Sequence, residues 1–254
     1  MICGGTILSG GPIHTMFEKL RAEFVFNFID GARWKYIVNG LGVTLKVTFF
    51  SLLLGIAIGL VVASIRSSYD QTHEELRPGP WKVIFKLLNS LCNLYLTVIR
   101  GTPVVVQLLI GYFIIFVSSN DTVLVATLVF GINSGAYITE IIRGGIMSVD
   151  HGQFEAGRSI GFNYLQTMRL VIIPQAFKNV LPSLANEFIA LLKETAVCGY
   201  IGLMDLTKGG DVIRGRTFSA FMPLIAVALI YLLLVIIFSK LVGILERRLR
   251  RNEH

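Results

Sequence analysis

Residues 47–65 form an uninterrupted run of 19 residues without a charged side chain, bracketed by Lys46 and Arg66. A helix over this run would be roughly 28 Å long, which is enough to cross the hydrocarbon core of a bilayer. Gly55 and Gly59 within it form a pair of small residues that lets another helix approach closely. The run therefore predicts a membrane-spanning helix.

Composition supports a membrane protein. Of the 254 residues, 54% are hydrophobic and 15% are charged, whereas a soluble domain carries about 25% charged residues. The net charge of +7 is then expected in cytoplasmic loops rather than on a nucleic-acid-binding surface. The three Cys and four His are scattered along the chain, so neither a metal site nor a disulfide framework is expected.

Four further apolar regions predict an all-α protein with about five transmembrane helices. The second region is interrupted by Gly101 and Pro103, and we interpret it as one crossing broken there, although a short interfacial helix followed by a span fits equally well. The fourth region is predicted to start after Pro182. The regions lie at residues 87–119, 122–142, 183–202 and 218–238.

The distribution of Lys and Arg orients the predicted spans. The segments before the first span, between the second and third, and between the fourth and fifth hold seven of these residues, and the opposite side holds thirteen. The positive-inside rule places the N-terminus outside and the C-terminus in the cytoplasm. We expect an extracellular segment over residues 1–38, a transmembrane domain over 39–248 and a cytoplasmic tail over 249–254.

The longest predicted cytoplasmic segment, residues 143–181, carries helix signals. Asp150 is placed to cap a short helix over residues 152–159. Gly161 is the expected stop, because glycine adopts a positive φ without a steric penalty. A second helix is predicted from about Tyr164 until Pro174 kinks or ends it. Two short helices presented to the cytoplasm are the prediction, and a loop lying on the membrane surface is the alternative.

This segment resembles the E-A-A…G…I-x-L-P signature of ABC-importer permeases. The resemblance is carried by Glu155, Ala156, Gly157, Gly161 and Pro174. The chain departs from the signature in having Gly157 in place of the second Ala, and in the apolar residues before Pro174. Further stretches resemble the polar amino-acid uptake branch of that family: RGTP at residues 100–103 with Gln107, NSGAY at 133–137 with Glu140, and LKET at 192–195.

The resemblance covers roughly residues 38–248 and implies a type I ABC importer permease fold with five spans. It implies a permease domain over residues 39–248 and a coupling segment over 148–181 that docks on a separate ATPase. The implied partners are two ATPase subunits, a second copy of the permease or a homologous one, and an extracellular or periplasmic substrate-binding protein. The implied location is the bacterial inner membrane, which the chain crosses several times.

No phosphate-cradling G-x-x-x-x-G-K-[ST] motif occurs in the chain. ATP and Mg²⁺ are therefore expected on the partner ATPase, and no cofactor is expected on this chain. The prediction is a transport subunit and not an enzyme.

Ionisable and polar side chains within spans are candidates for substrate binding, because they are costly to place there. In this hypothesis Glu140 or Glu194 meets an ammonium or guanidinium group of a polar, possibly cationic, amino acid. Lys193 or Asn133 meets a carboxylate. The alternative is that Lys193 pairs with a carboxylate of a neighbouring helix or of the partner protomer and only holds the bundle together. The candidates are Gln107, Asn133, Tyr137, Glu140, Lys193 and Glu194.

The rival function is a stand-alone secondary carrier or channel that uses Glu140, Lys193 and Glu194 as an ion relay. Such a protein would work without an ATPase. An intramembrane enzyme is disfavoured, because no His lies in any predicted span and no paired Asp appears there.

Overall fold

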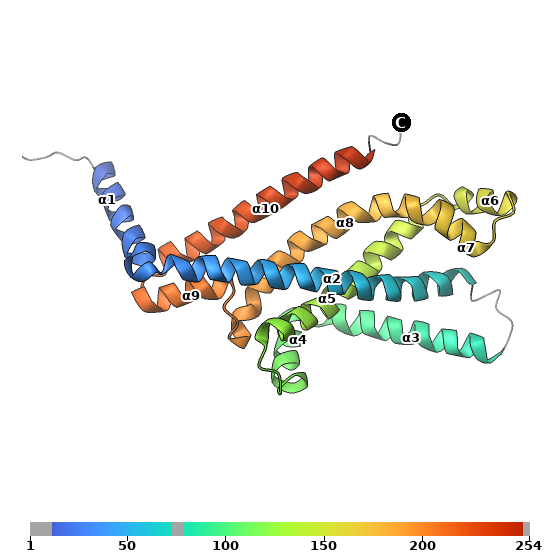
Figure 1. Ribbon diagram of the computed structural model, residues 1–254, viewed down its shortest axis with the longest axis horizontal. Coiled ribbons are helices and arrows are strands. Elements are labelled where there is room, and N and C mark those ends of the chain that lie inside the picture. Colours follow the sequence, from blue (N-terminus) through green and yellow to red (C-terminus); the bar gives the residue numbers. More distant parts are fainter. Residues whose placement is uncertain (1–11, 73–78, 251–254) are drawn as a thin grey trace, which may run out of the picture.

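The computed structural model describes residues 12–72 and 79–250, which form a helical bundle drawn out along one axis (Figure 1). The chain ends predicted as extracellular and cytoplasmic segments lie partly outside the described residues, at 1–11 and 251–254. Within the described part, four helices are long and apolar enough to cross a membrane: Trp34–Asp70, Pro80–Gly101, Thr122–Met147 and Phe221–Leu249. They belong to α2 (Trp34–Thr72), α3 (Pro80–Gly101), α5 (Thr122–Met147) and α10 (Phe221–Arg250).

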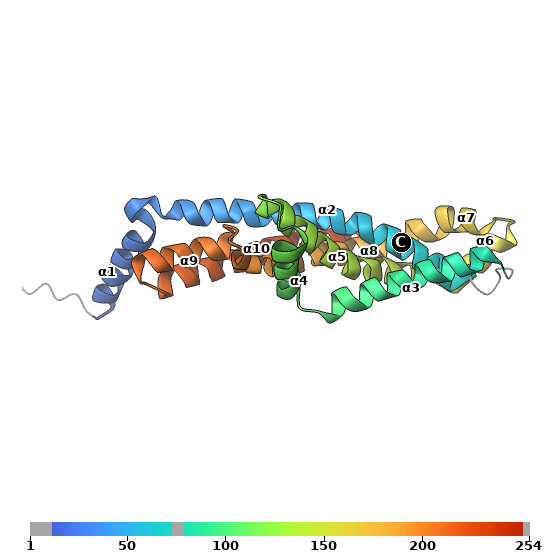
Figure 2. The same ribbon diagram turned by 90° about the horizontal axis from the view of Figure 1, so that it is seen from below.

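The second predicted span is two separate helices. The chain breaks as predicted after Gly101, where Thr102 is extended (φ −121°, ψ 145°). α3 alone is long enough to cross a bilayer, whereas α4 (Val104–Ile110) and the π-helix η3 (Gly111–Ile115) form a short apolar unit that leaves the direction of α3 (Figure 2). The region therefore holds one helix long enough to cross, and the predicted start of that helix was too late, because Lys82 and Lys86 lie within α3, which begins at Pro80.

The fourth predicted span is α8 (Ile173–Glu194), continued by the 3₁₀-helix η5 (Thr195–Ile201). It begins before Pro182, which lies inside the helix. The predicted start after Pro182 was therefore wrong, since a proline is tolerated in a helix that neighbouring helices cover. Gly202 ends η5 in the left-handed conformation (φ +77°).

Close packing of α2 against α5 forms the centre of the bundle. A Cβ added at Gly59 would lie 2.6 Å from Ile138 Cγ2, and one at Gly55 would lie 3.2 Å from the backbone nitrogen of Gly135. The two glycines thus allow α5 to approach α2 closely, as their spacing predicts. A buried apolar cluster that includes Val47, Leu108 and Phe130 joins α2, α4 and α5.

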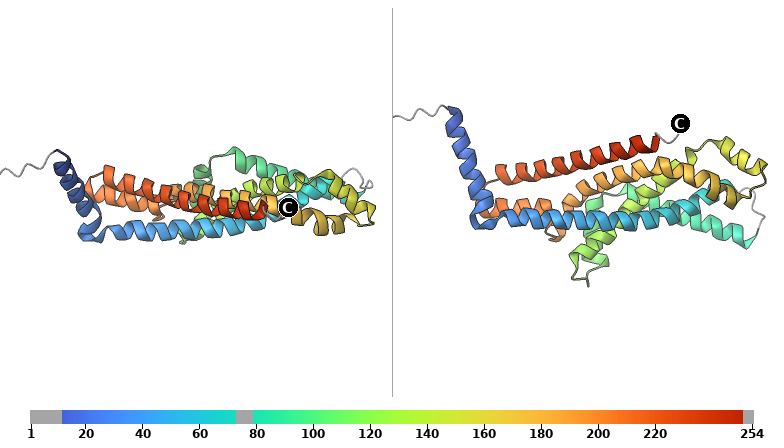
Figure 3. Two further views of the ribbon diagram at one scale, coloured as in Figure 1. Left: turned by 90° about the horizontal axis from the view of Figure 1, so that it is seen from above. Right: turned by 45° about the horizontal axis from the view of Figure 1, so that its top comes forward.

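The two ends of the bundle differ. At one end, α1 (Pro12–Phe24) is followed by the π-helix η1 (Val25–Ile29) and the 3₁₀-helix η2 (Asp30–Ala32), and α9 (Leu206–Thr217) packs beside the first half of α2 (Figures 1 and 3). At the other end lie α6 (His151–Ser159), α7 (Tyr164–Thr167) and the π-helix η4 (Met168–Ile172). The predicted coupling segment is therefore presented at one extremity.

Candidate functional site

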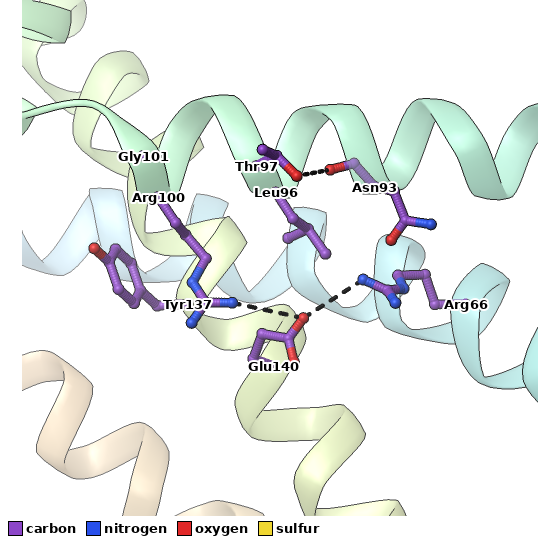
Figure 4. Close-up of a pocket in the computed structure, with 8 residues that line it drawn as sticks. All are labelled: Arg66, Asn93, Leu96, Thr97, Arg100, Gly101, Tyr137 and Glu140. Atoms are coloured by element: carbon purple, nitrogen blue, oxygen red, sulfur yellow. Dashed lines mark hydrogen bonds and ion pairs between the residues drawn. The ribbon is translucent and has the colours of Figure 1, made fainter.

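A cavity of about 430 Å³ lies between α2, α3 and α5 (Figure 4). This volume falls within the range of small-molecule sites. Polar and charged side chains dominate its walls. The lining residues are Arg66, Asn93, Leu96, Thr97, Arg100, Gly101, Tyr137 and Glu140.

Glu140 is the single carboxylate of the cavity lining, and it faces two guanidinium groups. Its Oε1 lies 3.6 Å from Arg66 Nη1 and 3.7 Å from Arg100 Nη1 (Figure 4). The Arg100 guanidinium also lies over the Tyr137 ring, 5.7 Å from its centroid. Arg100 belongs to α3 and thus reaches Glu140 of another helix, α5. Two positive groups and one negative group leave the lining with one net positive charge.

A third guanidinium group, that of Arg143, also lies close to the same carboxylate. The buried Nε atoms of Arg66 and Arg143 have no hydrogen-bond partner in the structure. Arg143 Nε lies 3.6 Å from Glu140 Oε2, and Arg143 Nη1 pairs with Asp70 Oδ2 at 3.0 Å. Three guanidinium groups therefore surround the Glu140 carboxylate, and Asp70 pairs with one of them.

Gln107 and Asn133 meet beside the cavity rather than in its lining. Asn133 is buried and its Nδ2 donates to Gln107 Oε1 at 2.9 Å. Gln107 Nε2 in turn donates to Ile99 O at 2.7 Å and to Thr102 Oγ1 at 2.8 Å. This pair holds the break between α3 and α4 and so positions Arg100 at the end of α3.

Only two of the six residues predicted for substrate binding, Tyr137 and Glu140, line the cavity. Lys193 and Glu194 lie on α8, which contributes no residue to it. Sequence reasoning missed Arg66, because the residue looked like the loop charge that ends an apolar run. Asn93 and Thr97 carry no sequence signal beyond their polarity inside α3.

The predicted coupling segment contains the first of the two expected short helices, which is α6. Asp150 Oδ1 caps α6 by accepting from Gly152 N at 2.7 Å. At the other end of α6, Gly161 has φ +89°, Gly161 N donates to Arg158 O at 3.0 Å, and Phe162 N donates to Gly157 O at 3.1 Å. These two bonds form the Schellman motif, which requires a left-handed residue at the position of Gly161.

The helix after α6 passes through Pro174 without ending. Asn163 and Gln166 form a reciprocal capping box at the start of α7. The chain then widens into the π-helix η4, and Pro174 lies in the first turn of α8. The helix therefore does not end at Pro174 as predicted, and what changes beside this residue is the passage from π-helix to α-helix.

Close contacts bind α6 to the neighbouring helices. A Cβ at Gly157 would lie 2.6 Å from Cγ2 of the buried Thr167, so Gly157 in place of the usual Ala fits the side chain opposite. Phe154 of α6 stacks on Tyr164 with ring centroids 6.0 Å apart. Burial raises the pKa of the Tyr164 phenol, and a hydrogen bond with Ser68 of α2 opposes this shift.

The outer face of α6 and the residue that follows the helix are exposed. Glu155, Ala156 and Arg158 are exposed, and Ile160 is 69% exposed. This face, at the extremity of the bundle (Figure 1), is available to another protein.

Residues 82–251 match the family of binding-protein-dependent transport system inner membrane components. The chain belongs to this family. It is therefore a permease subunit of a bacterial ABC transport system in the inner membrane, a transport component and not an enzyme. The family assignment does not favour the stand-alone carrier.

Curated relatives of this permease carry related names. It is 35% identical over 217 residues to a putative glutamine transport system permease of Rickettsia bellii, a match covering 84% of this chain and 93% of the relative. It is 35% identical over 221 residues to the arginine transport system permease ArtQ of Bacillus subtilis, covering 86% and 94%. It is 36% identical over 211 residues to the glutamine permease GlnP of Escherichia coli, covering 81% and 90%.

Solved structures confirm the type I importer permease fold. The crystal structure of an amino acid ABC transporter with histidines matches with a TM-score of 0.76 and 40% identity, covering 87% of this permease and 98% of that chain. The methionine transporter MetNI matches with a TM-score of 0.70 at 21% identity, covering 85% and 97%, which supports the fold alone.

Proposed function

We propose that this permease translocates polar amino acids through the cavity between α2, α3 and α5, driven by a separate ATPase that docks on α6. The observation that carries the proposal is Glu140 held between Arg66 and Arg100 in a 430 Å³ cavity. The names of the glutamine and arginine permeases support an amino acid as the substrate.

The cavity offers complementary groups for both ends of an amino acid. In the proposed complex, Arg66 and Arg100 bind the α-carboxylate, since a guanidinium presents paired donors that match a carboxylate. Glu140 binds the α-ammonium group.

The net charge of the cavity lining affects which amino-acid side chains the substrate can carry. With a net charge of +1, the lining repels a second positive charge on the substrate by about 2 kcal/mol at roughly 7 Å and an effective dielectric constant of about 20. The proposed substrate is therefore a zwitterionic amino acid with a neutral polar side chain, such as glutamine. Arginine or lysine should bind more weakly at this site.

Energy is proposed to enter through α6. The exposed face that includes Glu155, Ala156 and Arg158 would contact the ATPase, which would carry ATP and Mg²⁺. Movement of α6 would reach α7 through Gly157 and Thr167. It would then reach the span α5 where Gly145 packs against Val180 and Ala176 of α8.

The test is ATP-driven uptake into proteoliposomes that contain the permease, its ATPase and its binding protein. A panel of labelled amino acids is used, together with the Kd of the purified transporter for each. Uptake should require ATP, survive collapse of ion gradients and favour glutamine over arginine. Uptake that needs an ion gradient but no ATP would support the relay of Glu140, Lys193 and Glu194 instead.

Two matched variants test the cavity. Glu140→Gln removes the proposed ammonium partner and should raise the Kd at least about tenfold, because a hydrogen bond to a charged group contributes about 1.5–3 kcal/mol. Glu194→Gln changes a partly buried carboxylate outside the cavity and should leave the Kd unchanged. Equal losses in both variants, or a loss only in Glu194→Gln, would show that this cavity is not the substrate site.

A further inference from the structure

Among the described residues, α1 has an apolar side that is largely exposed, although the Phe24 ring lies 5.2 Å from that of Phe28 in η1 between centroids. At about 100° per residue, its large apolar side chains from Met16 to Phe24 fall within an arc of about 100°, and Ala22 lies opposite. Met16 is 55% exposed, Phe17 65% and Phe24 51%, while Leu20 is half-buried. A large exposed apolar stripe of this kind indicates an interaction surface.

α1 is held at a fixed orientation by a buried polar elbow. Asn27 is fully buried, its Nδ2 donates to Glu23 O at 2.8 Å, and its Oδ1 accepts from Thr217 Oγ1 of α9 at 2.8 Å. Gly31 (φ +63°) and Ala32 (φ +52°) then turn the chain into α2. As a result α1 stands steeply across the direction of α2, α8 and α10 in every view (Figures 1 to 3).

The elbow lies at the level where an uncharged span begins. Asn27 Nδ2 lies 3.4 Å from Ser219 Oγ, and Ser219 precedes α10, whose residues 221–239 carry no charge. Four exposed aromatic residues lie close to this junction in the sequence. Their side chains are exposed by 46% for Phe26, 46% for Trp34, 95% for Phe218 and 63% for Phe221. Aromatic residues concentrate at the membrane–water interface, so this end of the bundle lies at a membrane surface.

We propose that α1 lies in the plane of the membrane surface, with the face formed by Met16, Phe17, Leu20 and Phe24 in contact with lipid. A helix that runs across the spans at their end lies parallel to the bilayer, and helices of this type insert their apolar face by about 5–10 Å. The charged residues at positions 18, 19, 21 and 23 are two Glu, one Lys and one Arg. Because these charges balance, attachment depends on apolar area and not on anionic lipid.

The surface concerned is the one away from α6 and α7 (Figure 1). This surface is external because α6, at the other end, is proposed to dock the ATPase in the cytoplasm. Only that statement about the side of the membrane rests on the proposed function. The lipid contact of α1 does not depend on the substrate or on the ATPase, so the two proposals fail separately.

The experiment places a genetically encoded nitroxide amino acid at position 17 or, as the matched control on the opposite side, at position 22. The assembled transporter is reconstituted in phosphatidylcholine nanodiscs, and collisions with oxygen, which partitions into lipid, are compared with collisions with a water-soluble nickel chelate. Position 17 should be oxygen-accessible and shielded from nickel, and position 22 should show the reverse. Adding anionic lipid or salt should not change either result.

Two results would overturn the proposal. Free access of nickel to position 17 would mean that α1 projects into water. Shielding of position 17 from both reagents would mean that the apolar face contacts a second permease or another protein.

Discussion

The turn at Gly161 offers a sharp test of how the coupling segment works. The glycine has φ +89°, and a Cβ built on it would meet no heavy atom within 4 Å. Steric contact with neighbours therefore plays no part, and any cost of a substitution comes from the backbone conformation or from the partner. Alanine in a left-handed conformation costs about 1–2 kcal/mol, and asparagine tolerates that conformation better.

The expected order of activity is therefore wild type, then Gly161→Asn, then Gly161→Ala, although alanine is the smaller residue. A cost of 1–2 kcal/mol shifts the equilibrium between the closed and the opened turn by about 5- to 30-fold. Gly161→Asp should keep the turn about as well as asparagine but should abolish transport, because it brings a negative charge to the docking surface. Membrane insertion should be intact in all three variants.

The assay is ATP-driven uptake together with the affinity of the ATPase for the purified permease. The control is Gly144→Ala, a glycine inside α5 at the same end of the bundle, where an added Cβ also meets nothing within 4 Å. That variant should transport normally. Full transport by Gly161→Asp would refute the assignment of this segment to ATPase docking, and Gly161→Ala equal to wild type would refute the argument from backbone conformation.

Two glycine contacts yield further predictions. Gly40→Ala should lower the free energy of unfolding of the purified permease by about 1–3 kcal/mol, because its Cβ would clash with the backbone of Asp205. Gly42→Ala is the control and should not lower it, because a Cβ there meets nothing within 4 Å. Thermal unfolding of the two variants in detergent is the measurement. Gly157→Ala should impair ATPase binding, because the added methyl group displaces Thr167. The double variant Gly157→Ala with Thr167→Ala should bind the ATPase again. A double variant that still fails to bind would show that the loss does not come from the contact with Thr167.

Local signals made much of the coupling segment predictable. A cap such as Asp150 and a stop such as Gly161 act within a few residues of their own position, so the sequence contains the whole interaction. The first span was likewise predictable from the length of its uncharged run of residues. The same reasoning failed at α3, because Lys82 and Lys86 share a helix with an apolar run, and charge-free length alone cannot reveal such a helix.

The cavity was only half predictable, because its partners come from three helices. The spacing of Tyr137 and Glu140 placed both on one face of α5, and both line the cavity. Nothing in the sequence indicates that Arg66 of α2 would meet Glu140, since that contact depends on the register in which α2 and α5 pack. Lys193 and Glu194 attracted attention as charges within an apolar region, but their helix does not reach the cavity lining.

A continuous set of contacts joins the cavity to the coupling segment. Glu140 pairs with Arg143, and Arg143 pairs with Asp70 near the end of α2. Ser68, two residues earlier on α2, is bonded to Tyr164, whose ring stacks on Phe154 of α6. A substrate that draws Glu140 away from its arginines would therefore act on the same end of α2 that touches the coupling segment. Because coupling free energies are reciprocal, a change in substrate affinity caused by ATPase binding must be matched by an equal change in ATPase affinity caused by the substrate.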